Sequence, residues 1–117
     1  MTIEHILAVV PVADIATSAA WYEQLFGSAP KNRPMPKLVE WQVTESGWVQ
    51  VFEDKDRAGR SFVNFAVEEL ETHLDNLKSR GLSPGSIQDA TKGVRIASID
   101  DPDGNTVTFI GGFRVDY

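Results

Sequence analysis

Asp100-Asp101-Pro102-Asp103-Gly104-Asn105-Thr106-Val107-Thr108-Phe109 reads as the end of one strand, a tight turn and a second strand. Pro102 fixes φ early in the turn, and Gly104 accepts the left-handed conformation that the exit from a hairpin needs. After the turn, residues 105–110 alternate polar and apolar side chains, which is typical of a half-buried strand. This stretch therefore predicts a β-hairpin.

The composition of the chain limits what the protein can be. It has 117 residues, enough for one domain with its own core, and no cysteine, so disulfides and cysteine–zinc sites are excluded. The net charge is −6 and the basic residues are scattered, which argues against a nucleic-acid partner. Neither a secretory leader nor an apolar run of about 20 residues is present. We therefore expect a cytoplasmic protein that does not bind membranes.

The first half of the chain predicts a strand, a helix and two more strands. Residues 4–12 are a mostly apolar run typical of a buried strand. Asp14 is a suitable N-cap for a helix over 15–26, and Gly27 is suited to end it. An irregular segment with three prolines follows, and then two strands over 37–44 and 48–53.

The second half repeats this order. Residues 61–67 predict a strand, and leucines at helical spacing then predict a helix that ends at Gly81. His73, on this helix, is expected to be solvated or to flank the core. A weak strand over 84–90 is followed by the two strands of the hairpin.

The two halves match as an internal repeat. Residues 12–15 can be laid over 67–70, and residues 47–52 over 104–109. We predict an α+β fold of two βαβββ modules that form a curled mixed sheet around a cavity. The single domain of residues 1–117 then consists of module one (1–54), a linker (55–60) and module two (61–117).

Two motifs identify a resemblance to a known family. Val12-Ala13-Asp14-Ile15, followed by Trp21-Tyr22-Glu23-Gln24-Leu25-Phe26-Gly27, resembles the first helix of the vicinal oxygen chelate superfamily. Asp101-Pro102-Asp103-Gly104-Asn105 resembles its C-terminal motif. The superfamily includes glyoxalase I, extradiol dioxygenases and bleomycin-resistance proteins. The resemblance covers nearly the whole chain and implies the two-module fold, whereas one fold can carry many chemistries.

Enzymes of this superfamily hold a divalent metal with two histidines and two glutamates. By the resemblance, the first histidine position falls on Leu7, with His5 two residues earlier on the same strand face. The second histidine position falls on Phe62 or, one residue away, on Ser61. His5 is the one residue that can replace any of the four expected ligands, and it does so only if the strand shifts its register.

The glutamate positions of the superfamily fall on Gln50 or Val51 and on Thr108. An amide and a hydroxyl bring no negative charge to offset the cost of dehydrating a divalent cation. We therefore predict that the protein has no metal cofactor.

Strand alternation places apolar, aromatic and polar side chains on the cavity side of the predicted strands. This mixture suits a small organic ligand that stacks on rings and is oriented by a few hydrogen bonds. The predicted ligand-binding residues are His5, Trp48, Gln50, Phe52, Phe62, Asn64 and Thr108.

The sequence thus favours a metal-free protein that binds an apolar or aromatic small molecule and resembles bleomycin-resistance proteins, which are often dimers. The second hypothesis is a glyoxalase-like lyase or isomerase, or a dioxygenase-related enzyme, with a non-standard site, and the third is a subunit or regulatory domain in which the cavity is vestigial. Glu40 and Glu45 are available as a general base only if the cavity buries one of them.

Overall fold

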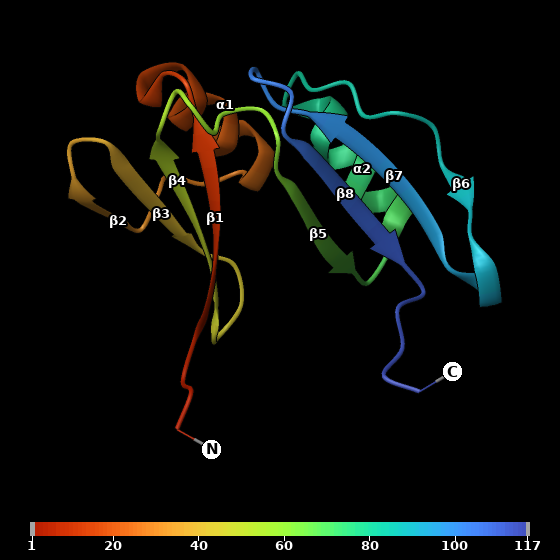
Figure 1. Ribbon diagram of the computed structural model, residues 1–117. Coiled ribbons are helices and arrows are strands. Elements are labelled where there is room, and N and C mark those ends of the chain that lie inside the picture. Colours follow the sequence, from red (N-terminus) through yellow and green to blue (C-terminus); the bar gives the residue numbers. More distant parts are fainter. Residues whose placement is uncertain (1, 117) are drawn as a thin grey trace.

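The computed structural model describes residues 2–116, which form two modules (Figure 1). The first contains β1 (Ile6–Val12), α1 (Ile15–Phe26), β2 (Asn32–Met35), β3 (Leu38–Gln42) and β4 (Gly47–Glu53). The second contains β5 (Phe62–Val67), α2 (Leu70–Ser79), β6 (Gln88–Asp89), a 3₁₀ turn (Thr91–Gly93), β7 (Arg95–Asp100) and β8 (Thr106–Gly111). The repeated βαβββ order is confirmed. Met1 and Tyr117, which the predicted modules included, lie outside the described residues.

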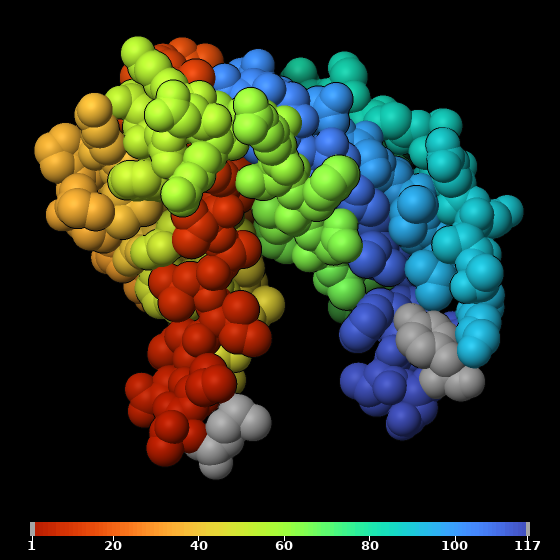
Figure 2. Space-filling view, in the orientation of Figure 1, coloured from red at the N-terminus to blue at the C-terminus, as the bar shows by residue number. Residues whose placement is uncertain are grey.

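Each module has its own four-stranded mixed sheet. Sheet A has the order β1-β4-β3-β2 and sheet B the order β5-β8-β7-β6. The first pair in each sheet is parallel and the others are antiparallel. Within residues 2–116 no strand of one sheet pairs with a strand of the other, so the sheets are curled but do not close into one. Figure 2 shows the modules as the two sides of an arch, with a hollow between them.

The strand register confirms the repeat but corrects its alignment. When the helix starts are superimposed, Gln50 of β4 and Thr108 of β8 occupy equivalent positions, because β1 and β5 pair with them in the same register. Laying residues 47–52 over 104–109 is therefore wrong by one residue, since it matches Thr108 to Val51. Val51 is fully buried, whereas Gln50 is only partly buried, so Gln50 and not Val51 is the residue of β4 that is equivalent to the partly buried Thr108.

Alternate residues of every long strand face the helix of their own module. In sheet A the buried side is formed largely by valines and Trp41, against α1. In sheet B it includes Val63, Val107 and Phe109, next to α2. The helix boundaries follow the predicted signals: the Asp14 side chain accepts from the Thr17 N–H, and Gly27 adopts a left-handed φ of 72°.

The turn between β7 and β8 is held by one buried carboxylate. Asp101 Oδ1 accepts from the backbone N–H groups of Asp103 and Asn105, both at 2.9 Å. Its Oδ2 accepts from Asn105 Nδ2 and from the Tyr22 hydroxyl of α1, both at 2.8 Å. Burial and the neighbouring Asp101 charge raise the pKa of the Tyr22 phenol, so it stays a donor. The hairpin thus docks onto helix α1.

Two further side chains of this turn reach the other module, and the turn's backbone lies against the linker. Asn105 Nδ2 also donates to the Pro11 carbonyl at the end of β1, 2.9 Å away. Asp103 Oδ2 accepts from the Ala13 N–H at 3.0 Å. The linker approaches so closely that a Cβ at Gly59 would lie 2.3 Å from the Asp103 carbonyl oxygen. The turn therefore fixes how the two modules sit against each other.

Tyr22→Phe tests this docking. The substitution leaves a buried carboxylate with one hydrogen-bond donor fewer, and it is expected to lower the free energy of unfolding by about 1–3 kcal/mol in denaturant titrations. Thr106→Val is the control, because it removes only an exposed hydroxyl bond to Asp100. Equal, small effects of the two changes would show that Tyr22 does not hold the modules together.

Candidate functional site

The side of each sheet away from its helix is open. Face A of sheet A is formed by His5, Leu7, Val9, Trp48, Gln50 and Phe52, and face B of sheet B by Phe62, Asn64, Ala66, Thr106, Thr108 and Ile110. The exposed fractions are 45% for Leu7, 51% for Val9 and 80% for Phe62. All seven residues predicted to bind a ligand therefore lie on these two faces. A group of large exposed apolar side chains on one sheet indicates a surface that binds a ligand or another protein.

Face A is bordered by a carboxylate that two amides hold in place. Gln50 Nε2 donates to Glu40 Oε2 at 2.8 Å, and Asn32 Nδ2 donates to Glu40 Oε1 at 3.0 Å. Glu40 is partly buried and pairs directly with Gln50 across β3 and β4. From the sequence, Glu40 was a candidate general base only if the cavity buried it. Its pairing with Gln50 was not predicted, because that pairing depends on the register of the hairpin.

Trp48 forms the aromatic part of face A. Its Nε1 donates to His5 Nδ1 at 3.2 Å, and the two rings meet edge to face with centroids 6.2 Å apart. Lys31 Nζ lies 5.8 Å from the Trp48 ring centroid, within cation–π range. His5 and Trp48 are thus brought together as one polar and aromatic unit.

The polar side chains of face B are not all hydrogen-bonded within residues 2–116. Thr108 Oγ1 and Ser98 Oγ are 2.7 Å apart and share a hydrogen bond, and Thr106 donates to Asp100. Among the described residues, the exposed Asn64 side chain makes no hydrogen bond, so its amide is available to a ligand.

The two faces do not meet within the chain. Among residues 2–116, no side-chain hydrogen bond, ion pair or ring contact joins face A to face B. The modules contact each other instead through α1, as in the bonds from Arg80 to the Gln24 and Leu25 carbonyls and the Phe26–Phe65 ring contact. The seven predicted residues therefore form two separate groups.

Comparisons with known proteins agree with this geometry. The family model described as Glyoxalase/Bleomycin resistance protein/Dioxygenase superfamily matches residues 2–109. The chain belongs to this superfamily. No curated protein sequence matches the chain.

Several solved structures share the fold. A glyoxalase/bleomycin resistance protein from Catenulispora acidiphila is 29% identical with a TM-score of 0.86, covering 92% of this chain and 96% of that one. A bleomycin-binding protein in complex with bleomycin is 19% identical with a TM-score of 0.77, over 93% and 98%. A lactoylglutathione lyase from Agrobacterium tumefaciens is 18% identical with a TM-score of 0.72, over 92% of each chain.

The metal site that the superfamily implies does not fit this chain. The resemblance implies that the ligand positions fall on Leu7 and Phe62, expected histidines, and on Gln50 and Thr108, expected glutamates, and none of these four side chains brings a negative charge or an imidazole. Nowhere in residues 2–116 do three His, Cys, Asp or Glu side chains gather as a metal would need. His5 bonds to Trp48 and lies away from any carboxylate cluster. We therefore derive no chemistry through a metal.

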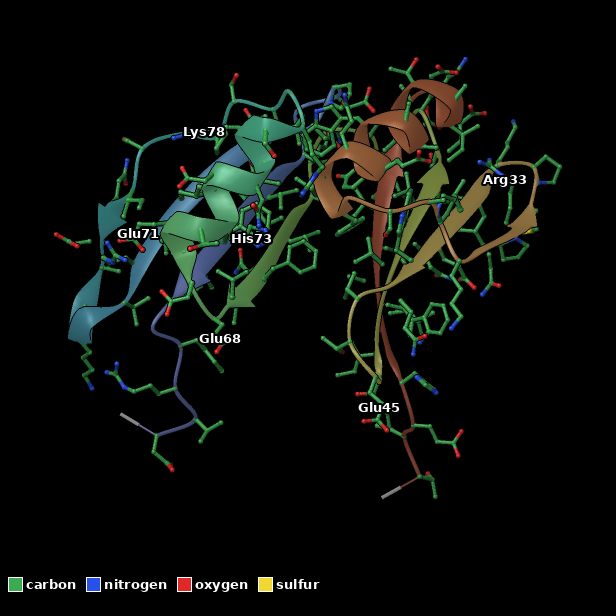
Figure 3. The ribbon with its side chains drawn as sticks, turned by 180° about the vertical axis from the view of Figure 1, so that it is seen from behind. Arg33, Glu45, Glu68, Glu71, His73 and Lys78 are labelled. Carbon is green, nitrogen blue, oxygen red and sulfur yellow. The ribbon has the colours of Figure 1, made fainter. Side chains whose placement is uncertain are left out.

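The sequence predicted that His73 is either solvated or flanks the core. In the structure it flanks the core. Its ring packs on Phe109 with centroids 4.5 Å apart, and its Nε2 is buried with no hydrogen-bond partner. Figure 3 shows His73 and Glu71 on different sides of α2. Burial, and then the Arg80 charge, hold the pKa of His73 below its usual value of 6.5. The helical pattern did not reveal this, because His73 borders the leucine stripe.

Replacing His73 should change how stability depends on pH. In the wild type the unfolded chain takes up a proton before the folded one as the pH falls through about 6.5, so stability decreases between pH 7 and 5. His73→Leu should remove this part of the decrease and raise the free energy of unfolding by about 1 kcal/mol, because a buried orphan nitrogen is lost. Denaturant titrations at both pH values measure it.

His5→Ala is the matched control, since His5 is the second of two histidines and is exposed. In His5→Ala the part of the decrease that comes from His73 should remain. If His73→Leu keeps the wild-type pH profile, the interpretation of His73 as a buried neutral imidazole is wrong.

Proposed function

We propose that this superfamily member is a small-molecule binding protein without a metal cofactor, which holds an apolar or aromatic ligand on its open sheet faces. The observation that carries the proposal is that faces A and B keep exposed apolar and hydrogen-bonding side chains on sheets that nothing covers within the described chain. The bleomycin-binding protein of the same fold supports it, since that protein is seen with a bound small molecule.

Each face supplies part of the proposed site. Trp48, Phe52 and Phe62 offer ring surfaces on which a ligand stacks. The hydrogen-bonding groups that orient it are His5, Gln50, Asn64 and Thr108. Gln50 is already held by Glu40, so its position is set before a ligand arrives, which lowers the entropic cost of binding.

A second copy of the chain is the partner that we propose for the open faces. One face leaves a ligand half exposed, whereas small-molecule sites generally bury most of the ligand. In a dimer with two-fold symmetry, face A of each copy covers face B of the other, which closes the assembly and produces two equal crevices. The exposed Leu7, Val9 and Phe62 would then be buried.

The domain organisation and the location belong to the same proposal. We propose one domain built from modules 1–54 and 61–117 with a linker at 55–60, acting in the cytoplasm. No helix among residues 2–116 has the length and apolar character that a membrane crossing needs.

A screen of aromatic compounds by thermal shift tests ligand binding. A ligand at 100 times its Kd stabilises the protein by about 2.7 kcal/mol. For any ligand found, Gln50→Leu and Thr108→Val should each weaken binding about 2- to 10-fold, because each removes one hydrogen bond.

Gln24→Leu, on the exposed surface of α1, is the matched control and should bind normally. A ligand whose affinity is the same in all three variants would not use the open faces. A broad panel without any stabilising compound would contradict the proposed function.

Sedimentation velocity tests the proposed dimer. The wild type should sediment as a dimer at micromolar concentration, and Phe62→Asp should shift it to monomer, because it places a charge in an apolar contact. Phe113→Asp is the control, since Phe113 is also exposed but lies in the C-terminal segment after β8. A monomeric wild type that binds its ligand fully would contradict this arrangement.

An enzyme with a non-standard site is the second candidate. The specific observation that favours it is Glu40, a partly buried carboxylate on sheet A, held 2.8 Å from Gln50 and so able to act as a general base towards a bound ligand. Metal analysis separates the metal-dependent form from the binding proposal: stoichiometric zinc, nickel, manganese or iron that is lost in His5→Ala would favour the enzyme. Turnover of a bound compound that stops in Glu40→Gln would favour the metal-free form.

A further inference from the structure

A separate cavity lies between the modules on their helix-covered sides. Its volume is about 300 Å³, and its lining comes from both sides of the hollow that Figure 2 shows. Four aromatic side chains form a continuous wall across the two modules. Phe26 contacts Trp41 and Phe65 with ring centroids 5.3 and 5.8 Å apart, and Phe65 stacks on Phe109 at 5.9 Å. None of these four residues belongs to face A or face B, whereas Ala66 of face B also lines the cavity at its edge.

Most of the cavity wall is apolar, and the indole N–H of Trp41 is already bonded. Trp41 Nε1 donates to the Ser28 carbonyl at 3.0 Å, so its hydrogen-bonding capacity is used and its ring faces remain. The volume is at the lower end of the range of small-molecule sites, about 300–1,000 Å³, which suits a ligand with one or two rings.

Among residues 2–116, Arg80 is the one charged residue that lines the cavity, and no carboxylate lines it. Its Nε and Nη2 donate to the Gln24 and Leu25 carbonyls at 2.6 and 2.9 Å, which holds the guanidinium at the end of α1. Within residues 2–116 it forms no ion pair, and its Nη1 has no hydrogen-bond partner. A fixed cation with a free donor therefore borders an aromatic cavity in a protein of net charge −6.

His73 lies at the same cavity and is the second group without a partner. It is one of the lining residues, its Nε2 is buried and unpaired, and it lies near enough to Arg80 to feel its charge. His73 therefore lines the cavity through its ring, where a bound ligand would change the surroundings of the ring protons.

We propose that this cavity binds a small aromatic carboxylate, at a site separate from the open sheet faces. The rings of the ligand pack against Phe26, Trp41, Phe65 and Phe109. The carboxylate accepts a charge-assisted hydrogen bond from Arg80 Nη1, on the side of the cavity where His73 lies. The positive charge of Arg80 disfavours a cationic ligand. A neutral ligand of the same shape leaves the Arg80 charge without a counterion.

Three compounds of one shape test the charge preference. Calorimetric titrations of the full chain with 2-naphthoate, 2-naphthamide and 2-naphthylmethylamine compare an anion, a neutral amide and a cation. We expect 2-naphthoate to bind at least tenfold more tightly than the amide, and the amine not to bind. In proton NMR the His73 ring signals should shift with 2-naphthoate while those of His5 stay in place. Equal binding of all three compounds, or no binding at millimolar concentration, would overturn the proposal.

Variants then locate the site. Val43→Trp fills the cavity from an exposed apolar position at the end of β3 and should abolish 2-naphthoate binding. Arg80→Gln should weaken it at least tenfold, and Lys78→Gln, which removes the same charge two residues away on an exposed position, should not. Because Arg80 also binds the end of α1, circular dichroism must show that Arg80→Gln is folded. If Arg80→Gln is unfolded, Val43→Trp alone decides whether 2-naphthoate binds in the cavity.

The test also distinguishes this cavity from the proposed site on the sheets. Gln50→Leu and Thr108→Val should leave 2-naphthoate binding unchanged. If these variants weaken it and Val43→Trp does not, the carboxylate binds on the open faces and the cavity proposal is wrong, while the proposed function stands.

Discussion

The Asp101 carboxylate is the interaction on which the arrangement of this protein depends. It is almost fully buried, and it accepts hydrogen bonds from its own turn, from Asn105 and from Tyr22 of the other module. A buried charge is tolerated only where several donors replace water. The turn therefore has one conformation and one docking position, and the two sheets inherit their relative orientation from it.

This docking explains where the open surfaces lie. Because the modules meet through α1 and the helix-covered sides of the sheets, faces A and B are left without a covering layer within the chain. The same contact creates the aromatic cavity beneath α1, lined by residues of both modules. One structural constraint thus produces two surfaces of different character, an open pair of sheet faces and a partly enclosed cavity with one cation.

The sequence predicted much of the fold because its signals are local. Asp14, Gly27 and the alternation of valines act within a few residues, so the strands, the helices and the side chains of each face could be assigned before the structure was known. Where a prediction needed contacts between distant segments it was less accurate. The repeat was aligned one residue out of register in β4 and β8, and Glu40 gained its partners only through strand pairing.

The sequence by itself determined the βαβββ repeat, the resemblance to the superfamily and the identity of the residues on the two faces. Each of these depends on residue type and short-range periodicity. Only the tertiary structure decided that faces A and B stay apart, that His73 packs on Phe109 with its Nε2 buried and that Arg80 borders an aromatic cavity. These features depend on how module two docks on α1, and that docking is set by hydrogen bonds between residues about 80 positions apart, such as Tyr22 and Asp101.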